Sequence, residues 1–459
     1  MIKLKTNPFD KLRTGSQKSK AVCMKGSYLP VILLLSVVFI TLASSVASIA
    51  MANLKEARHN EKLISSLEVS EAGINYYMWH LSHDNTDYCD GNICNGLGPF
   101  GPFTHQFTDS SNKVIGSYDL YVTPPTTGDA VITVKSVGRL VGSKSERVVI
   151  AEVGMPSFAK YSFLTDSECW FGAGETTNGP VHSNAGVHFD GVANGVVSSS
   201  SKTYKPSNSF GGDGGEHDGV WGDGGPKGFW IYPVPSVDFN KISVDMVNMK
   251  VLANNGGIYL GSSGSLGYYI KLQTNDKISV YRVSSEKDDG IIATYLQDYD
   301  LPGNGMMYVA DNVWVDGTFN NKITIAAEIT TGNSDAKIKI KDNLLYSTKD
   351  GSANIGLIAE SNIEVPRYAI NDIEIDAAML AQKGHVWFPY SSGYIKNSIS
   401  IYGSISTNLY WTWSWINGSG NITSGYRMTT QTYDPYLTLS PPPQFPTTGS
   451  FAILSWREE

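Results

Sequence analysis

The feature that most constrains this chain is an uncharged segment close to its N-terminus. No charged residue occurs between Gly26 and Leu54, and residues 31–40 are apolar on every face of a helix. A helix needs about 20 predominantly apolar residues to cross the hydrocarbon core of a bilayer. The segment therefore predicts a transmembrane helix over residues 27–54, with Pro30 near its start, where the missing N–H costs little.

The charges in front of this segment predict its orientation. Residues 1–26 form a basic leader with seven Lys or Arg residues and one acidic residue, Asp10. Because basic flanks stay on the cytoplasmic side, we expect a single-pass protein of the cytoplasmic membrane whose C-terminal body is exported. A cleaved secretory signal is the alternative. Its apolar region is typically about 7–15 residues, shorter than this one, but residues 43–45 and 50–52 offer small side chains for cleavage.

The helical pattern continues past the apolar segment. Residues 53–81 contain no proline, and apolar residues recur there among charged ones at largely helical spacing. Together the two segments predict one helix of about 50 residues, about 75 Å long at 1.5 Å per residue. An ordinary membrane anchor followed by a short juxtamembrane helix is the alternative.

The start of the chain resembles a known family. Lys25-Gly26 at the end of the leader, the apolar helix from Ser27, the two acidic residues Glu56 and Glu61, and the segment Val-Ser-Glu-Ala-Gly at 69–73 are similar to PilX-type minor pilins and related pseudopilins. The resemblance covers residues 20–80. It implies that a prepilin peptidase cleaves between Gly26 and Ser27. It also implies a type IV pilus system, with other pilins and inner-membrane pilus assembly components as partners.

One position departs from the pattern of major pilins. In that family a glutamate five residues into the mature chain helps to set register during fibre assembly, whereas Val31 occupies this position here. The departure implies a minor subunit at a tip, in an initiating complex or in a non-fibre position, rather than a bulk fibre subunit. It also leaves the cleavage itself open, and Met24 is an alternative start of the chain.

Beyond residue 81 the sequence predicts strands and no further long helix. Alternating segments at 117–122, 130–137 and 145–153 are separated by turn signals. A long helix packed on a small antiparallel sheet is the pilin architecture, so residues 55–154 are expected to form the helix extension and a pilin-like β-sheet. Cys89 and Cys94 are candidates for a small loop disulfide in an exported body. No second Cys or His pair stands at zinc spacing, so we expect no zinc site.

Residues 155–459 predict a separate β-rich domain. Short Ile/Val strands recur at irregular intervals among Gly, Asn and Asp. This pattern favours a right-handed parallel β-helix, in which each coil buries its face on the next. A β-sandwich is the alternative. The segment also resembles an uncharacterised domain family found behind pilin-like anchors, which brings no known activity. That resemblance rests on residues 161–166, 179–184, 433–435 and 441–446.

The sequence carries no recognisable catalytic motif, neither a nucleophile elbow nor a phosphate-binding or dinucleotide-binding loop. His182 and His188, with Glu175 and Asp190, are the one ionisable cluster that suggests a metal or acid–base site, and we interpret it as structural. No cofactor and no metal are expected. Calcium binding by the Gly/Asp-rich loop at 210–228 is an alternative that the sequence leaves open.

The aromatic residues between positions 410 and 415 are the most unusual concentration in the chain. Strand alternation predicts Trp411, Trp413 and Trp415 on one face, as a surface for sugars or a protein partner. The alternative is that the three indoles cap the end of the solenoid core. Residues 27–459 carry a formal charge of −14 within the total of −8, which argues against nucleic acid as a partner.

These observations predict a mainly β protein with one long N-terminal α-helix and no enzymatic activity. We expect a minor pilin-like protein, associated with type IV pilus assembly, that displays a large exported β domain at the cell surface. An anchored carbohydrate-binding or adhesin domain is the alternative function. A polysaccharide-acting enzyme is a less favoured alternative. It is kept because some enzymes of this kind use β-helices, so the fold alone would not exclude such cleavage.

Overall fold

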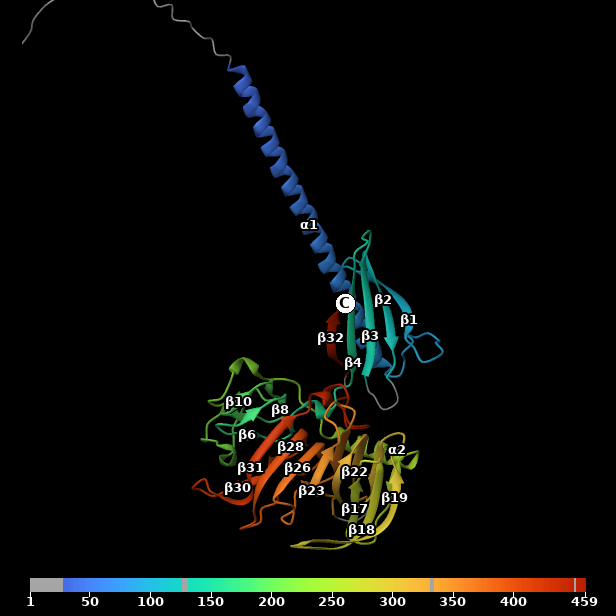
Figure 1. Cartoon of the computed structure of the whole chain (residues 1–459), viewed down its shortest axis with the longest axis vertical. Coiled ribbons are helices and arrows are strands. Elements are labelled where there is room, and N and C mark those ends of the chain that lie inside the picture. The colour runs from blue at the N-terminus through green and yellow to red at the C-terminus, as the bar shows by residue number, and fades with distance from the viewer. Residues whose placement is uncertain (1–27, 126–130, 331–333, 450) are drawn as a thin grey trace, which may run out of the picture. The chain divides into compact units, whose positions relative to one another are not determined.

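The computed structural model describes residues 28–125, 131–330, 334–449 and 451–459 (Figure 1). The chain divides into two compact units, one up to residue 64 and the other from residue 65 onwards. It is mainly β with one long N-terminal helix, which confirms the predicted fold class.

Helix α1 runs without interruption from Leu29 to His83, so the prediction of one continuous helix is confirmed. Up to residue 64 nearly all its side chains are exposed. From Ser66 onwards one face is buried at intervals of three or four residues, the spacing of an amphipathic helix that packs on a core. The buried residues of this face are Ser66, Val69, Ser70, Gly73, Ile74, Tyr77 and Leu81.

A five-stranded antiparallel sheet receives this buried face. Inward-facing residues alternate with half-exposed ones, most clearly along β2 and β3, the period of two expected of a sheet with one covered face. Leu120, Val134 and Ala151 are fully buried against Ile74 and Tyr77 of α1. The strands, in spatial order, are β1 (Phe100–Thr108), β2 (Val114–Thr123), β3 (Val131–Leu140), β4 (Glu146–Gly154) and β32 (Ala452–Glu458).

The fifth strand comes from the far end of the chain. β32 pairs antiparallel with β4, and the Ser455 hydroxyl donates a hydrogen bond of 2.7 Å to the Glu152 carboxylate. Residues 155–451 are therefore an insertion between two neighbouring strands of one sheet. This return was not predictable from the sequence, because the residues of a seven-residue strand do not indicate which strand it pairs with.

The inserted residues form a long parallel ladder whose spatial order differs from the chain order. The ladder runs β15–β11–β8–β5–β28–β26–β24–β22–β20–β16, so the first coils stack on the last ones. Helix α2 (Lys241–Asn254) lies in the connection between β15 and β16, the two ends of the ladder. The strands are β5 (Phe163–Thr165), β8 (Val181–Ser183), β11 (Val197–Ser199), β15 (Trp230–Ile231), β16 (Ile258–Leu260), β20 (Met306–Val309), β22 (Lys322–Ala327), β24 (Asn354–Ala359), β26 (Asp372–Ala381) and β28 (Ile395–Thr407).

Both faces of this ladder are buried. Met307, Ile325 and Leu357 point into the interior of the coils, and neighbours such as Tyr308 and Ile358 pack on the opposite face under α2 and residues 435–446. Parallel strands buried on both faces are apolar without alternation, which explains the continuous runs of Ile, Val and Ala. This predominantly parallel stacking is consistent with the expected β-helix.

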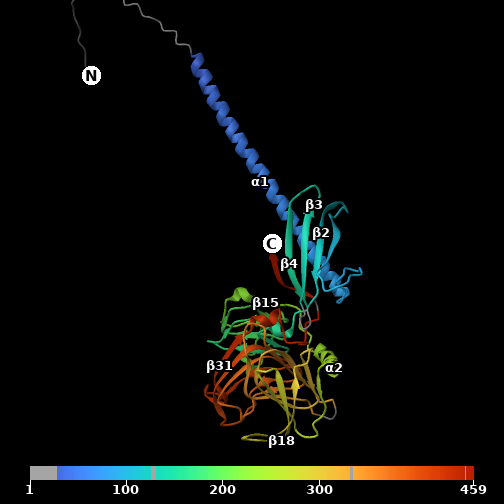
Figure 2. The ribbon, with the colours of Figure 1, turned by 45° about the vertical axis from the view of Figure 1, so that its right-hand side comes forward.

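Further strands complete the coils and their ends (Figure 2). A second parallel ladder consists of β17 (Gly267–Leu272), β21 (Val313–Phe319), β23 (Ile338–Tyr346), β25 (Ile363–Glu364), β27 (Val386–Trp387) and β29 (Trp411–Thr412). β18 (Lys277–Lys287) and β19 (Gly290–Asp300) extend it as an antiparallel hairpin. β31 (Ile422–Tyr433) pairs with β28 and with β30 (Ser414–Ile416). The first coils add β6 (Cys169–Phe171), β7 (Thr176–Thr177), β9 (Val187–Phe189), β10 (Val192–Ala193), β12 (Thr203–Tyr204), β13 (His217–Asp218) and β14 (Val220–Trp221).

Helix α2 was missed by the prediction of strands alone. Its buried residues Ile242, Met246, Met249 and Ala253 recur at helical spacing, which is a signal that the sequence contains. The surrounding Ser, Asn and Val residues are weak helix formers and obscure it.

Candidate functional site

The N-terminal half of α1 has the properties of a membrane span. Within it, a stretch of 18 residues has a mean hydropathy of 2.5, and none of that stretch is buried. Among the described residues this is the one helix that is long and apolar enough to cross a bilayer. The expected cleavage site, Gly26 and Ser27, lies outside the described residues.

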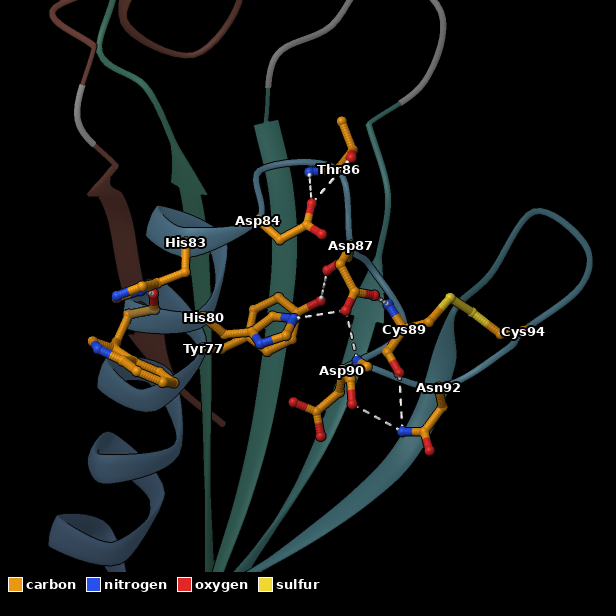
Figure 3. A network of polar contacts seen from close by, with 12 residues as sticks. Tyr77, His80, His83, Asp84, Thr86, Asp87, Cys89, Asp90, Asn92 and Cys94 are labelled. Atoms are coloured by element: carbon orange, nitrogen blue, oxygen red, sulfur yellow. Dashed lines mark hydrogen bonds and ion pairs between the residues drawn. A yellow bond between two sulfur atoms is a disulfide. The ribbon is translucent and has the colours of Figure 1, made fainter.

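The loop after α1 is organised around the Asp87 carboxylate (Figure 3). It accepts hydrogen bonds from the backbone N–H groups of Cys89 at 2.8 Å and Gly91 at 2.6 Å, and its Oδ2 lies 3.1 Å from His80 Nε2. Partial burial raises the pKa of Asp87, but the two N–H donors and His80 together outweigh it, so the net shift is downward. Cys89 and Cys94 form a disulfide in the same loop, with their Cα atoms 5.9 Å apart.

A second carboxylate ties this loop to the sheet. Asp90 accepts a hydrogen bond from the Tyr76 hydroxyl on α1 at 3.1 Å, and it lies 2.7 Å from His105 Nε2 on β1. Asp90 has a positive φ of 54°, a conformation that Asp tolerates better than most residues. Burial, followed by the charge of Asp90, raises the pKa of Tyr76 to about 12. All these groups have protein partners, so the arrangement is structural rather than chemically reactive.

The three tryptophans at 411–415 do not form one exposed surface. Trp413 is buried at 5% exposure in the interior core, and Trp411 stacks on Phe163 with ring centroids 4.6 Å apart. Trp415 instead meets Trp387 and donates its indole N–H to the Phe388 carbonyl at 2.8 Å. The single-face expectation fails because β29 ends at Thr412 and β30 begins at Ser414, so the alternation is interrupted at Trp413.

Trp411 and Trp413 line a cavity of about 550 Å³. It lies where the first coil meets the last coil of the β domain. β5 pairs with β28 across this junction, whereas β6 and β7 have no pairing with β29 or β31 among the described strands. Because these strands are not hydrogen-bonded to one another, the cavity remains between them. Its walls are Trp170, Phe171, Thr176–Asn178, Phe210, Tyr410–Ser414 and Thr429–Thr432, with Phe163, Cys169, Gly174 and Glu175.

Two side chains of this lining have buried polar atoms without a hydrogen-bond partner. Neither amide atom of Gln431 on β31 has one among the described residues, nor does the Thr177 hydroxyl on β7. Buried polar groups are almost always paired, so each such group asks for an explanation. The sequence does not single out these residues, because Thr429, Thr430 and Thr432 are exposed and polar side chains are ordinary on an exposed strand.

A stack of four rings supports one wall of the cavity. The Trp170 ring lies over the His188 ring at an interplanar angle of 6°. The ring centroids of His188 and Trp221 are 3.9 Å apart, and those of Trp221 and His217 are 3.7 Å apart. His188 Nδ1 is 2.9 Å from the Phe210 carbonyl oxygen, and its Nε2 is 3.1 Å from the Asp190 carboxylate. The stack holds Trp170 and Phe210, two wall residues, in fixed positions.

His182 lies apart from this stack. Its two ring nitrogens contact Ser198 Oγ and Asn184 Oδ1, each at 3.0 Å, and burial lowers its pKa. Glu175 lines the cavity and contacts neither histidine. Among the described residues, no group of three or more His, Cys, Asp or Glu side chains is placed to hold a metal ion, the loop at 210–228 included.

Several acidic residues of the coils pair with lysines. Asp316 pairs with Lys341, Glu364 with Lys337 and Asp376 with Lys349. Glycoside hydrolysis needs two carboxyl groups that flank one bond. The cavity has only Glu175 as a carboxylate among its described lining residues.

No family model matches the chain, and no curated protein matches it. Among solved structures, the chain is similar to the crystal structure of the competence-associated pilin ComZ from Thermus thermophilus, at 14% identity. The match covers 87% of this chain and 97% of that one with a TM-score of 0.26.

Proposed function

We propose that this protein is a minor-pilin-like component of a type IV pilus system, anchored in the cytoplasmic membrane by α1 and without enzymatic activity. Its partners are other pilins and the inner-membrane assembly components. The observation that carries the proposal is that the two parts of α1 have different surroundings. Residues 29–54 are uncharged and exposed, whereas residues from Ser66 onwards pack on an antiparallel sheet.

An exposed apolar helix of this length needs an apolar environment. In a bilayer that environment is lipid, and in a fibre it is the helices of neighbouring subunits, so the same surface serves both states. A helix meant only as an anchor has no need to continue by about eight further turns into a folded domain. The continuous α1 and the sheet that covers its C-terminal part therefore support a pilin-like subunit over a simple anchored spacer.

The inserted domain supports a minor rather than a bulk subunit. Residues 155–451 are held at both ends by neighbouring strands, β4 and β32, so they are fixed to the pilin-like sheet by two connections. An insertion of this size on every subunit would crowd a helical fibre. Val31, at the position of the glutamate that sets register in major pilins, supports the same assignment. We place the protein at a tip, in an initiating complex or in a non-fibre position.

The first test is N-terminal sequencing of the membrane-bound protein from cells with and without the prepilin peptidase. We expect the chain to begin at Ser27 only when the peptidase is present, and the variant Gly26→Leu to stay uncut. Gly15→Leu is the matched control, because it changes another glycine of the leader and leaves the expected cleavage site intact. An N-terminus near Ser45 or Asn53 would establish a secretory signal and overturn the proposal.

The second test is co-purification after mild crosslinking in cells. Recovery with pilins or the assembly platform is the expected result. Recovery only with peptidoglycan or outer-layer proteins would contradict the pilus assignment, even if the leader is cleaved as expected.

A further inference from the structure

We propose that the cavity between the first and last coils binds a neutral oligosaccharide. This function goes beyond the pilus role, which makes no use of the cavity. Its volume of about 550 Å³ lies within the range of about 300–1,000 Å³ typical of ligand pockets.

The lining combines the two kinds of surface that a sugar presents. Trp170, Tyr410 and Trp411 offer aromatic rings for the apolar C–H faces of pyranose rings. Threonine hydroxyls and the side-chain amides of Asn178 and Gln431 offer donors and acceptors for sugar hydroxyls. An apolar ligand would displace water from the threonines and amides without pairing them, which is costly.

The unpartnered side chains are the strongest observation. The buried Gln431 amide carries two donors and one acceptor, none of them used among the described residues, and the Thr177 hydroxyl is equally unused at 2% exposure. A vicinal diol presents both donor and acceptor, so it can satisfy an amide at both ends. These atoms have almost no accessible surface in the unliganded chain, so a ligand pairs with them only when the Gln431 and Thr177 side chains turn towards the cavity. That pairing then recovers the stability that their unpaired state costs.

The charge of the lining selects for neutral ligands. None of the described residues that line the cavity is Lys, Arg or His, and Glu175 is the one charged residue among them. A phosphate, sulfate or uronate group would enter without a cation to compensate it and would face this carboxylate. Nucleic acids and acidic polysaccharides are therefore disfavoured.

The walls are held in place before any ligand arrives. Trp170 is stacked on His188 and donates its indole N–H to Asp190 at 3.0 Å, and Trp411 is stacked on Phe163. Fixed aromatic rings lose little conformational entropy on binding, so more of the contact energy remains as affinity.

The test uses the full chain in detergent micelles and calorimetric titration with four defined probes. Maltotetraose, cellotetraose and chitotetraose are neutral, and tetragalacturonate is an anionic comparator of the same length. We expect at least one neutral probe to bind one-to-one and tetragalacturonate to bind at least about 10-fold more weakly. If none of the three neutral probes binds, or if the anionic probe binds as well as they do, the proposal is wrong.

Two nearly isosteric variants locate the site. Gln431→Met and Thr177→Val each remove an unpartnered polar group at little change in volume. Each is expected to lower affinity by roughly 10-fold. Because an unsatisfied buried group is also removed, the melting temperature of the unliganded protein should stay the same or rise, so lost binding cannot be ascribed to misfolding.

Gln297→Met is the matched control, since Gln297 is exposed on β19 away from the cavity. The affinity of this variant for the neutral probe should equal that of the unaltered chain. Unchanged affinity in both Gln431→Met and Thr177→Val would overturn the assignment of the site. Cleavage of Gly26–Ser27 does not depend on this result, so the pilus proposal and the sugar proposal fail separately.

Discussion

The Ser70 hydroxyl on α1 donates a buried hydrogen bond of 2.7 Å to the carbonyl oxygen of Ser136 on β3. This contact requires the helix and the strand to approach closely. Gly138, two residues after Ser136 on β3, allows this approach because it has no side chain. A Cβ atom on Gly138 would collide with the backbone of Ser66 and Ser70. The helix–sheet core therefore depends on a position where only hydrogen fits.

Gly138→Ala is expected to destabilise the five-stranded sheet and its contact with α1 by about 1–3 kcal/mol, the usual cost of overpacking a rigid contact. Urea unfolding followed by circular dichroism measures the change. Gly228→Ala is the control, because a Cβ there meets no atom within 4 Å and its φ is not in the left-handed region. Equal stability of both variants would show that α1 and β3 separate easily.

Asp87→Asn tests the loop that carries the disulfide. The variant keeps the shape but weakens two charge-assisted hydrogen bonds from Cys89 and Gly91, so it should lower the free energy of unfolding by about 1 kcal/mol at pH 7. Because the folded-state pKa is lowered, the stabilisation is present above the unfolded-state pKa of about 3.9 and is lost as pH falls through the folded-state pKa.

The difference between Asp87→Asn and the unaltered chain should therefore shrink below pH 3.9. Chemical unfolding at pH 7 and at pH 3 measures it. Asp84→Asn serves as the control, since Asp84 is exposed and its carboxylate accepts hydrogen bonds only from Thr86 among the described residues. A difference that grows at low pH would contradict the role of the ionised Asp87.

The helix and the fold class were predictable because their signals are local. An uncharged run and helical spacing define α1 within a window of residues, and the short Ile/Val runs define the coils in the same way. The permuted order of the ladder was not predictable, because β5 pairs with β28 across a separation of some 240 residues and neither strand carries a register signal.

The candidate site shows the same limit. The sequence drew attention to Trp411 and Trp413, which line the cavity, and to Trp415, which does not. Strand alternation was applied across Trp413, where pairing is interrupted, so the common face was wrong. Gln431 and Thr177 became notable only when burial and missing partners were known, and neither property can be read from residue types.

Removal of residues 452–459 tests the return of the chain. β4 would lose its hydrogen bonds to β32 while keeping those to β3, so its outward-facing amides should exchange faster. Hydrogen-exchange mass spectrometry of a peptide covering 146–154 measures this, and a peptide covering 354–359 in the β domain is the internal control. Unchanged exchange in the first peptide would mean that β32 does not pair with β4 in solution.

The final prediction concerns the Lys349–Asp376 ion pair, in which Nζ and Oδ1 are 2.8 Å apart. The Asp376 side chain is 3% exposed, and burial raises its pKa although Lys349 and the Tyr346 N–H oppose the shift. A raised pKa means that the ionised form is disfavoured in the folded state. The protein is therefore relatively more stable below the unfolded-state pKa of about 3.9, and that advantage is lost as pH rises through the folded-state pKa.

Lys349→Met removes the cation that offsets this burial and leaves a carboxylate without its counter-charge. Since Lys349 is 46% exposed, solvent screens part of the effect, and we expect a loss of about 1–3 kcal/mol at pH 7. At pH 4 a larger fraction of Asp376 is protonated and the loss should be smaller. Lys277→Met is the matched control: its partner Asp300 is 85% exposed, so the variant should change stability little at either pH. An equal loss at pH 7 and pH 4 for Lys349→Met would show that the lysine contributes through packing of its methylene groups rather than through the charge of Asp376.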